Sequence, residues 1–468
     1  MSRWFKKWPT LAVLLVVALV AAACGEDEPA PTTAAATTQA PATTQAPATT
    51  EAAPMAAGEV MAMCDVAIPE VSVNFGMAPF GDHTIYSHAM AEGWFEEVGI
   101  NINEKFATIP YEQIVALLVN EDYDFTTQYG PNELQSMLRA PDVQQVTFSD
   151  AYVGLYFLAP PDSGLDTVPD LVASGMSYED AFTQVVGQMV GKRVAIDDTG
   201  SHRSFVDAVF EAGGVTPDDF AELITVDDAR MLLLGRGGQA DFVKPLGGAQ
   251  NAELIQDGWY PILGATDLIA LLPPGDPRGA TGIGHTGLGA RASHYAEDPD
   301  TFLRVASVMY RVIDAIKKDV AEGTDVALAN ILPVLESAAA VEIGIEGLRI
   351  IYGTIDPMKS FEEQTEYWGD ESNPFHYKNV YRPQIEAAQE GGILPADQDI
   401  DPSLGFGLAE EIYHTLVDLR AQYDSMVSQA GGLEGPYAEM AAIAATHYEN
   451  RNYLDAARIL ETAVAGGC

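Results

Sequence analysis

The stretch that most restricts the fold of this chain is residues 83–103, HTIYSHAMAEGWFEEVGININ. Three apolar residues in its first half recur at helical spacing: Ile85, Ala89 and Met90. Gly99 can take the left-handed conformation that ends a helix, and residues 100–103 then alternate between isoleucine and asparagine, as a strand does. Another strand is predicted at residues 71–75. The stretch therefore predicts one helix and one strand in a β-α-β unit that opens an α/β domain.

Predicted strands and helices alternate through residues 69–157 and again through 159–265, which indicates an α/β fold. In the second segment, residues 168–190 predict a mostly helical stretch that is longer than such a unit needs. Residues 266–295 contain two apolar runs, which predict two strands that cross back between the two segments. From Pro299 onward the pattern is helical.

The N-terminus reads as a targeting segment, residues 1–23. Its first positions carry basic residues: Arg3, Lys6 and Lys7. The apolar run at residues 11–20 is too short to remain as a membrane-spanning helix. Three alanines precede Cys24, which resembles a bacterial lipobox and predicts a mature chain that starts with lipidated Cys24. The alternative is an ordinary secretory signal followed by a chance cysteine.

Residues 24–65 form a predicted tether, rich in Thr, Ala and Pro, that cannot bury a core. Lipidation of Cys24 leaves Cys64 and Cys468, both in an oxidising setting outside the cell. The sequence has no Cys-x-x-Cys motif and no Cys/His metal spacing. The two cysteines either form a disulfide, which ties the C-terminal tail to the start of the folded domain, or remain free thiols.

The formal net charge of −44 excludes some partners. Such a surface repels nucleic-acid phosphates and anionic lipid head groups, so neither is expected to bind. Because the acidic residues are spread along the chain, the charge favours a role in solvation over an acidic binding surface.

Residues 83–103 also carry a family resemblance, through small, glycine, aromatic and apolar residues in a fixed order: Ala91, Gly93, Phe95, Gly99, Ile100 and Ile102. After residue 191 the order strand, Thr-Gly-Ser, helix, glycine, Thr-Pro-Asp-Asp and strand matches the same family. The chain resembles the nitrate/sulfonate/taurine family of periplasmic-type solute-binding proteins, including the branch for thiamine pyrimidine precursors, over residues 70–405. The resemblance implies an α/β, two-lobed periplasmic-binding-protein type II fold.

The resemblance also implies a domain organisation. Residues 66–158 begin lobe 1, residues 159–265 form lobe 2, and crossover strands and helices at 266–405 complete lobe 1. Residues 406–468 extend beyond the family pattern and predict three amphipathic helices, at 408–429, 437–449 and 453–464. We expect these helices to form a cap on the body, although the last two also resemble a single tetratricopeptide-type hairpin.

One group of candidate ligand-binding residues is consecutive: Thr199, Gly200, Ser201, His202 and Arg203. They open a predicted helix, and a helix N-terminus offers unpaired N–H groups and a positive dipole end to an anion. The family resemblance implies that this loop lines a ligand cleft. The alternative is that Ser201 only caps the helix and Arg203 solvates the surface. Lys244, beside a later strand end, is expected to be a solvated lysine.

The second group lies near predicted strand ends. The resemblance places Phe80 and His83 at the cleft, where Phe80 could stack on a ring and His83 could donate a hydrogen bond. The alternative is that Asp82 caps the following helix and His83 is exposed. Three further candidates occupy strand ends, where open α/β sheets bind ligands: Tyr129, Gly130 and Tyr152.

The sequence lacks Gly-x-Ser-x-Gly, His-Glu-x-x-His and the P-loop. His83 and His88 are spaced by five residues, which turns them to different sides of a helix and disfavours a shared metal. We therefore expect no catalytic residue, cofactor or metal. The expected protein is a monomeric, lipid-anchored component of an ABC importer on the extracytoplasmic face. It would bind a small anionic or polar heteroaromatic solute and the permease subunits. The alternatives are an enzyme of pyrimidine-precursor type on the same fold, or a surface receptor or scaffold using the C-terminal helices.

Overall fold

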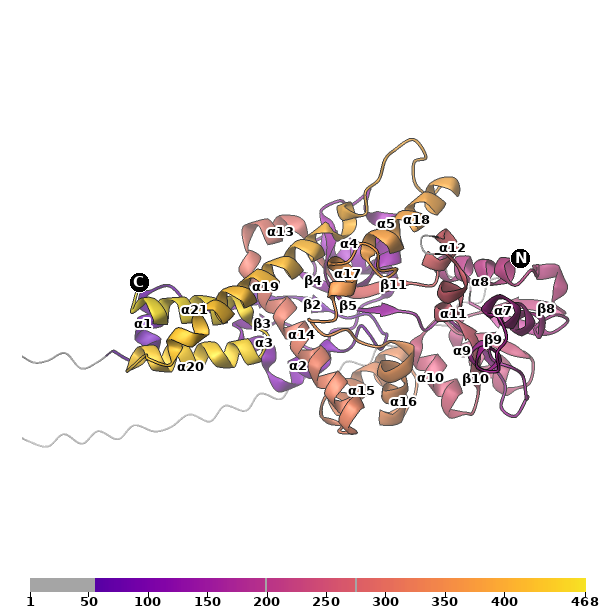
Figure 1. Cartoon of the computed structure of the whole chain (residues 1–468), viewed down its shortest axis with the longest axis horizontal. Coiled ribbons are helices and arrows are strands. Elements are labelled where there is room, and N and C mark those ends of the chain that lie inside the picture. The colour runs from indigo at the N-terminus through magenta and orange to yellow at the C-terminus, as the bar shows by residue number, and fades with distance from the viewer. Residues whose placement is uncertain (1–54, 198–199, 274–275) are drawn as a thin grey trace, which may run out of the picture. The chain divides into compact units, whose positions relative to one another are not determined.

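The computed structural model describes residues 55–468, apart from 198–199 and 274–275 (Figure 1). The predicted signal segment, Cys24 and most of the predicted tether lie outside the described residues. Residues 54–468 make up one compact unit, in which helices and strands form two lobes and a helical C-terminal extension.

The first lobe is built on a mixed four-stranded sheet. Its strands lie in the order β2 (Phe75–Gly76), β4 (Phe125–Tyr129), β11 (Gly284–Arg291) and β5 (Val143–Tyr152). β2 and β4 are parallel, whereas β11 runs antiparallel to both β4 and β5. β1 (Val71–Val73) and β3 (Ile100–Ile102) form a separate parallel pair. Four of the five residues of β4 are buried, so this strand is covered on both faces.

The predicted helix of the opening unit is in fact two short helices. α2 (Tyr86–Glu92) ends at Gly93, whose φ is 75°, and α3 (Trp94–Glu97) follows directly. The prediction of one continuous helix is wrong because Gly93 takes a left-handed conformation that glycine adopts at little cost. Gly99 then turns the chain into β3 with a φ of 78°. A Cβ at Gly99 would lie 2.2 Å from the carbonyl oxygen of Pro69.

The second lobe contains a five-stranded sheet. Its order is β10 (Tyr260–Gly264), β6 (Tyr156–Ala159), β9 (Phe242–Lys244), β7 (Arg193–Ile196) and β8 (Glu222–Thr225). β7 is parallel to both β8 and β9, and β6 is antiparallel to both β9 and β10. The parallel strands are joined through helices α8 (Gly200–Ala212) and α9 (Asp228–Arg236), and α10 (Gly248–Gln256) leads to β10.

The stretch 168–190 is also broken. α6 (Val168–Ala173) and α7 (Tyr178–Gly187) are separated by a turn in which Gly175 has a φ of 99°. Ser177 caps α7 by accepting a hydrogen bond from the N–H of Asp180. A glycine in a left-handed turn followed by a helix cap explains why one long helix does not form.

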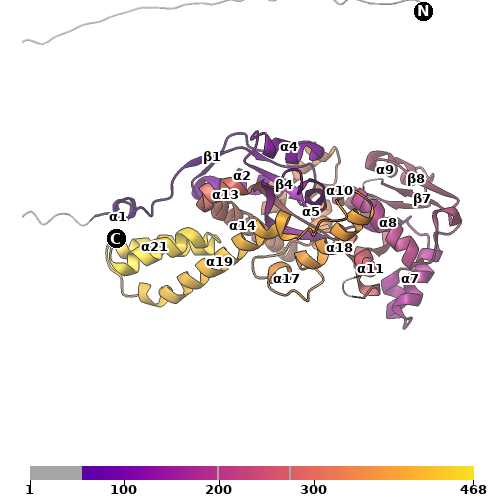
Figure 2. The same cartoon turned by 90° about the horizontal axis from the view of Figure 1, so that it is seen from above.

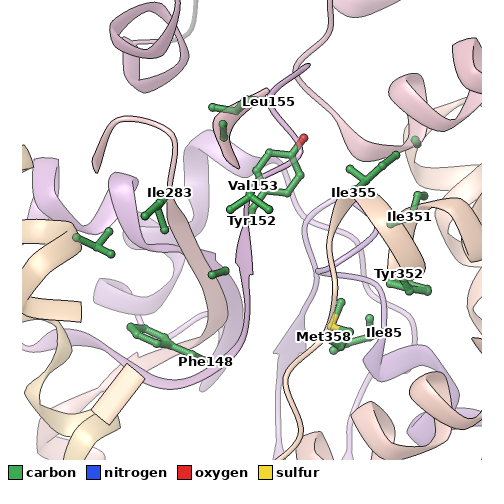
Figure 3. Packing of buried hydrophobic residues seen from close by; sticks show 14 of the residues in the cluster. Ile85, Phe148, Tyr152, Val153, Leu155, Ile283, Ile351, Tyr352, Ile355 and Met358 are labelled. Carbon is green, nitrogen blue, oxygen red and sulfur yellow. The ribbon is translucent and has the colours of Figure 1, made fainter. Parts of the chain in front are cut away.

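Two connections join the lobes. The first is residues 153–155, between β5 and β6. The second runs from β10 through α11 (Ala265–Leu271) and α12 (Pro277–Ala280) to β11. The prediction of two strands at 266–295 is wrong for the first run, which is α11; the backbone N–H of Gly264 is held by the Asp267 carboxylate at its start. Figure 3 shows apolar side chains around the first connection, among them Val153, Leu155 and Ile355, which all belong to the main core.

Further helices complete the first lobe. The early ones are the turn at Tyr111–Gln113, α4 (Ile114–Val119) and α5 (Gly130–Ser136). The later ones are α13 (Ala292–Glu297), α14 (Pro299–Glu322), α15 (Val326–Ala339), α16 (Gly344–Ile350), the π turn Ile351–Ile355, α17 (Thr365–Trp368) and α18 (Tyr377–Glu390). Among the described residues no single helix is long and apolar enough to cross a membrane, and one pair bent by 92°, residues 326–339 and 344–355, meets that test by length and composition.

The C-terminal extension consists of α19 (Ser403–Ala430), α20 (Pro436–Glu449) and α21 (Tyr453–Ala465). α1 (Ala57–Met63) packs with these helices around a small apolar core of its own, separate from the main one. α1 lies beside α21 and the C-terminus in both views (Figures 1 and 2). A disulfide joins Cys64, just after α1, to Cys468 at the end of the chain.

Candidate functional site

A cavity of about 890 Å³ is bordered by both lobes. The first lobe contributes the loop before α2, the turn before α4 and the ends of β4 and β5, while the second contributes the start of α8 and the loop before α10. Its wall includes Phe80, Tyr111, Tyr129, Tyr152, His202 and Leu246. The Tyr152 hydroxyl donates to the carbonyl oxygen of Leu246 at 2.9 Å, so one hydrogen bond links β5 to the second lobe beside the cavity.

Aromatic rings make up much of the cavity wall. Phe80 and Tyr111 meet edge to face, with ring centroids 5.3 Å apart, and His83 lies 5.5 Å from Phe80. Tyr129 and Tyr152 form a second edge-to-face pair at 6.4 Å. Rings held in this way by their neighbours offer flat apolar surface at a low cost in side-chain entropy. The wall is therefore suited to a flat or apolar part of a small molecule.

His83 is buried, so the alternative that it is exposed is wrong. Its Nδ1 lies 2.7 Å from the Thr127 hydroxyl, and its Nε2 lies 3.8 Å from Asp82. Burial lowers the pKa of His83, while the charge of Asp82 acts in the opposite direction. The imidazole is therefore neutral near pH 7 and can both donate and accept a hydrogen bond.

Lys244 is wholly buried, so the prediction of a solvated lysine is wrong. Residues Ile196 and Lys244 pair across the parallel strands β7 and β9, and Asp197 directly follows Ile196. The ammonium consequently lies 2.6 Å from the Asp197 carboxylate, and 2.9 Å from Nδ1 of His202. The negative charge of Asp197 therefore balances the positive charge of Lys244 inside the protein.

The pair also fixes the protonation of its neighbour. Burial and the charge of Lys244 lower the pKa of His202 to about 4, so this side chain is neutral at pH 7. Burial acts to raise the pKa of Asp197, but its contacts with His202 and Lys244 lower it overall. His202 lines the cavity and has a polar but uncharged ring there.

Three carboxyl groups meet at the same wall: Asp82, which lines the cavity, and Asp150 and Asp356 behind it. One oxygen of each lies within 4.8 Å of an oxygen of the other two. Burial, followed by the charge of the neighbouring carboxylates, raises the pKa of both Asp150 and Asp356. Carboxylate oxygens are the ligands that hard cations prefer, so this cluster could hold a metal.

The structure brings five of the sequence-predicted residues to the cavity wall: Phe80, His83, Tyr129, Tyr152 and His202. Gly130 instead packs against Tyr381. The approach is so close that a Cβ at this position would lie 1.8 Å from the tyrosine hydroxyl oxygen. Arg203 points along α8 to Asp207 at 3.0 Å and does not line the cavity. Gly200 is the first residue of α8, and Thr199 and the side chain of Ser201 lie outside the described part of the chain.

Sequence reasoning missed several residues of the wall. Tyr111, Gln128 and the backbone at 246–248 line the cavity, and Asp82 does so in addition to its place in the carboxyl cluster. Tyr111 directly follows Pro110 and opens the turn Tyr111–Gln113, and a proline is a signal for the start of a helical turn. Gln128 belongs to the buried run of β4 and carries no such signal.

No family model and no curated protein matches the sequence. Solved structures match its fold. A putative sulfonate ABC transporter periplasmic sulfonate-binding protein SsuA from Methylobacillus flagellatus KT aligns at 13% identity over 74% of this chain and 95% of its own, with a TM-score of 0.50. The periplasmic aliphatic sulphonate binding protein SsuA from Escherichia coli aligns at 13% identity over 71% and 91%, with a TM-score of 0.46. The periplasmic nitrate-binding protein NrtA from Synechocystis PCC 6803 aligns at 13% identity over 74% and 88%, with a TM-score of 0.44.

The first of these likenesses defines a class of fold. The chain has the α/β, two-lobed fold of periplasmic solute-binding proteins, with a helical C-terminal extension. This confirms the fold predicted from residues 83–103 and from the second-lobe pattern. A fold of this kind does not by itself distinguish a binding protein from an enzyme. The residues that line the cavity determine which of the two functions is possible.

Proposed function

We propose that the protein is the lipid-anchored, extracytoplasmic solute-binding component of an ABC importer and that it binds without chemical change. The observation that carries this proposal is the cavity bordered by both lobes, with the Tyr152–Leu246 hydrogen bond beside it. A cavity between two lobes that are joined by two connections is suited to capture by hinge closure. The partner would be a permease that receives the closed form.

Closure follows from where the connections lie. Residues 153–155 and the connection through α11 and α12 leave the two sheets separate, so the lobes can rotate about these connections without breaking either sheet. A solute can contact Tyr111 from one lobe and His202 from the other at the same time only in the closed form. Its differential affinity for that form supplies the free energy of closure.

The chemistry of the wall supports a small solute that is a polar heteroaromatic, and Arg139, which also lines the cavity, can pair with an anionic group. Phe80, Tyr111 and Tyr129 favour a flat ring, and the neutral rings of His83 and His202 offer hydrogen bonds to it. A sulfonate is the solute named for the Methylobacillus protein of the same fold. A panel of solutes should therefore contain sulfonates, nitrate, aromatic acids and aminopyrimidines.

The Tyr111→Ala variant should bind the best solute of that panel at least about tenfold more weakly than the wild type, because it loses an aromatic wall of the cavity. A thermal-shift screen finds the solute, since a ligand that binds only the folded state raises the melting temperature. Isothermal titration then gives both affinities. The control is Tyr295→Ala, a tyrosine of α13 outside the cavity, which should bind like the wild type. Equal affinity of Tyr111→Ala and the wild type would place the solute elsewhere.

The Cys24→Ser variant should be released into the medium when the full chain is expressed in a bacterium that has a single membrane. Without the thiol no lipid can be attached, and the apolar run at residues 11–20 is too short to hold the chain as a membrane-spanning helix. Immunoblots of the membrane and medium fractions measure the effect, with Thr33→Ser as the tether control. A Cys24→Ser protein that stays in the membrane fraction as fully as the wild type would contradict the anchor.

A further inference from the structure

The three clustered carboxyl groups come from three separate parts of the first lobe. Asp82 precedes α2, Asp150 lies on β5, and Asp356 directly follows the π turn Ile351–Ile355. Asp150 and Asp356 are 0% and 1% exposed, and Asp82 is 8% exposed and lines the cavity. Three segments of the core thus deliver acidic groups to one buried point that is reached from the cavity.

No cation of the described chain balances these groups. Among the ion pairs of the described residues only His83 approaches the cluster, at 3.8 Å from Asp82, and no lysine or arginine does. The Asp82 carboxylate accepts a hydrogen bond from Thr286 at 2.6 Å, and Asp150 accepts one from Ser149 at 2.6 Å. These neutral donors orient the oxygens without cancelling their charge.

A second observation is independent of the clustering. Oδ1 of Asp150 and Oδ1 of Asp356 are both buried and have no donor partner among the described residues. Buried polar atoms are almost always hydrogen-bonded, and leaving a charged one unpaired is costly. Two carboxyl groups in contact are both acceptors, so they need a positive occupant, either a proton or a metal cation.

We propose that Asp82, Asp150 and Asp356 form a Ca²⁺-binding site in the wall of the cavity. Oxygen atoms that lie within 4.8 Å of one another can share one cation at the 2.3–2.6 Å distances that Ca²⁺ takes. Mg²⁺ fits less well, because it gives up its water reluctantly and two of the three groups are buried. Water, or an oxygen of a bound solute, fills the positions that face the cavity.

The site has a structural consequence. Asp82 follows Phe80 and precedes His83, two residues of the cavity wall, so a bound cation would tie that loop to β5 and to the segment after the π turn. It would also add positive charge to a wall whose charged residues are Asp82, Glu112 and Arg139. The strongly negative chain raises the local concentration of divalent cations.

The test uses the full chain after removal of bound metal with a chelator. At constant ionic strength, 1 mM Ca²⁺ should raise the melting temperature of the wild type by roughly 3–6 °C. Asp356→Asn should lose most of this rise, because it removes one ligand while keeping the shape. The control Asp267→Asn should keep it, because Asp267 is a buried carboxyl group that bonds Tyr178 and Gly264 in the second lobe.

Surface carboxylates also bind Ca²⁺ weakly, so a stoichiometric measurement accompanies the melting curves. Equilibrium dialysis with labelled Ca²⁺ should find one tight site per wild-type chain and none in Asp356→Asn. If Asp356→Asn does not fold, Asp82→Asn at the cavity edge serves in its place. A wild type without a tight site, or a variant that retains it, would overturn the proposal and leave protons as the occupants of the cluster.

Discussion

The Asp455→Ala variant is expected to lose about 3–5 kcal/mol of unfolding free energy. Asp455 of α21 and Arg304 of α14 are 3% and 4% exposed at their side chains. Nε and Nη2 of Arg304 donate to the two carboxylate oxygens at 2.9 and 2.8 Å. Alanine leaves the guanidinium buried without its counter-ion, which is costlier than the loss of one hydrogen bond. Denaturant unfolding followed by circular dichroism measures the change.

The same two helices supply a matched control. Arg458 of α21 pairs with Asp300 of α14, with side chains that are 45% and 29% exposed. The Arg458→Ala variant should lose less than about 1 kcal/mol, because water screens an exposed pair. Replacing Arg304 and Asp455 together by Met and Leu should recover much of the lost stability. A small effect of Asp455→Ala would mean that α21 does not pack on α14 in solution.

Between pH 5 and pH 9 the protein should lose roughly 3–5 kcal/mol of stability through Glu133 alone. Burial raises the pKa of Glu133 to about 8, against a smaller opposing effect of the hydrogen bond from Gln128. The folded chain therefore keeps this proton after the unfolded chain has released it. The contribution is complete below about pH 4.5 and is lost as the pH rises through about 8.

The Glu133→Gln variant isolates this contribution, because glutamine stays neutral. Its stability should match that of the wild type near pH 5 and exceed it by roughly 3–5 kcal/mol at pH 9. Denaturant unfolding at each pH gives the comparison, with Glu390→Gln as the exposed control. If the profiles of Glu133→Gln and the wild type run parallel, Glu133 is already ionised in the folded chain.

The local pattern of the sequence predicted most elements but not their breaks. Residues 100–102 alternate as a strand and form β3, and the helical pattern predicted from Pro299 onward includes α14 and α15. Gly93 and Gly175 interrupt predicted helices because each takes a left-handed conformation, and helical periodicity does not indicate which glycine will do so. The first apolar run after residue 265 was predicted as a strand but is helical. Periodicity in a short apolar run cannot distinguish a buried strand from a buried helix.

The site was predicted where it depends on local position and missed where it depends on strand pairing. Tyr129 and Tyr152 lie at strand ends, and sheet geometry brings such ends to a cavity. The burial of Lys244 depends on the register of β7 and β9, which places Asp197 beside it. The carboxyl cluster joins segments that are far apart in the chain, and no sequence spacing reveals it.

The bond between Cys64 and Cys468 closes most of the polypeptide into a covalent ring. A protease that cuts a loop inside this ring opens it without freeing a fragment, so a nicked molecule stays in one piece until it is reduced. If lipid holds Cys24 at the membrane, a single cut sheds the protein from the cell surface only when it falls between Cys24 and Cys64.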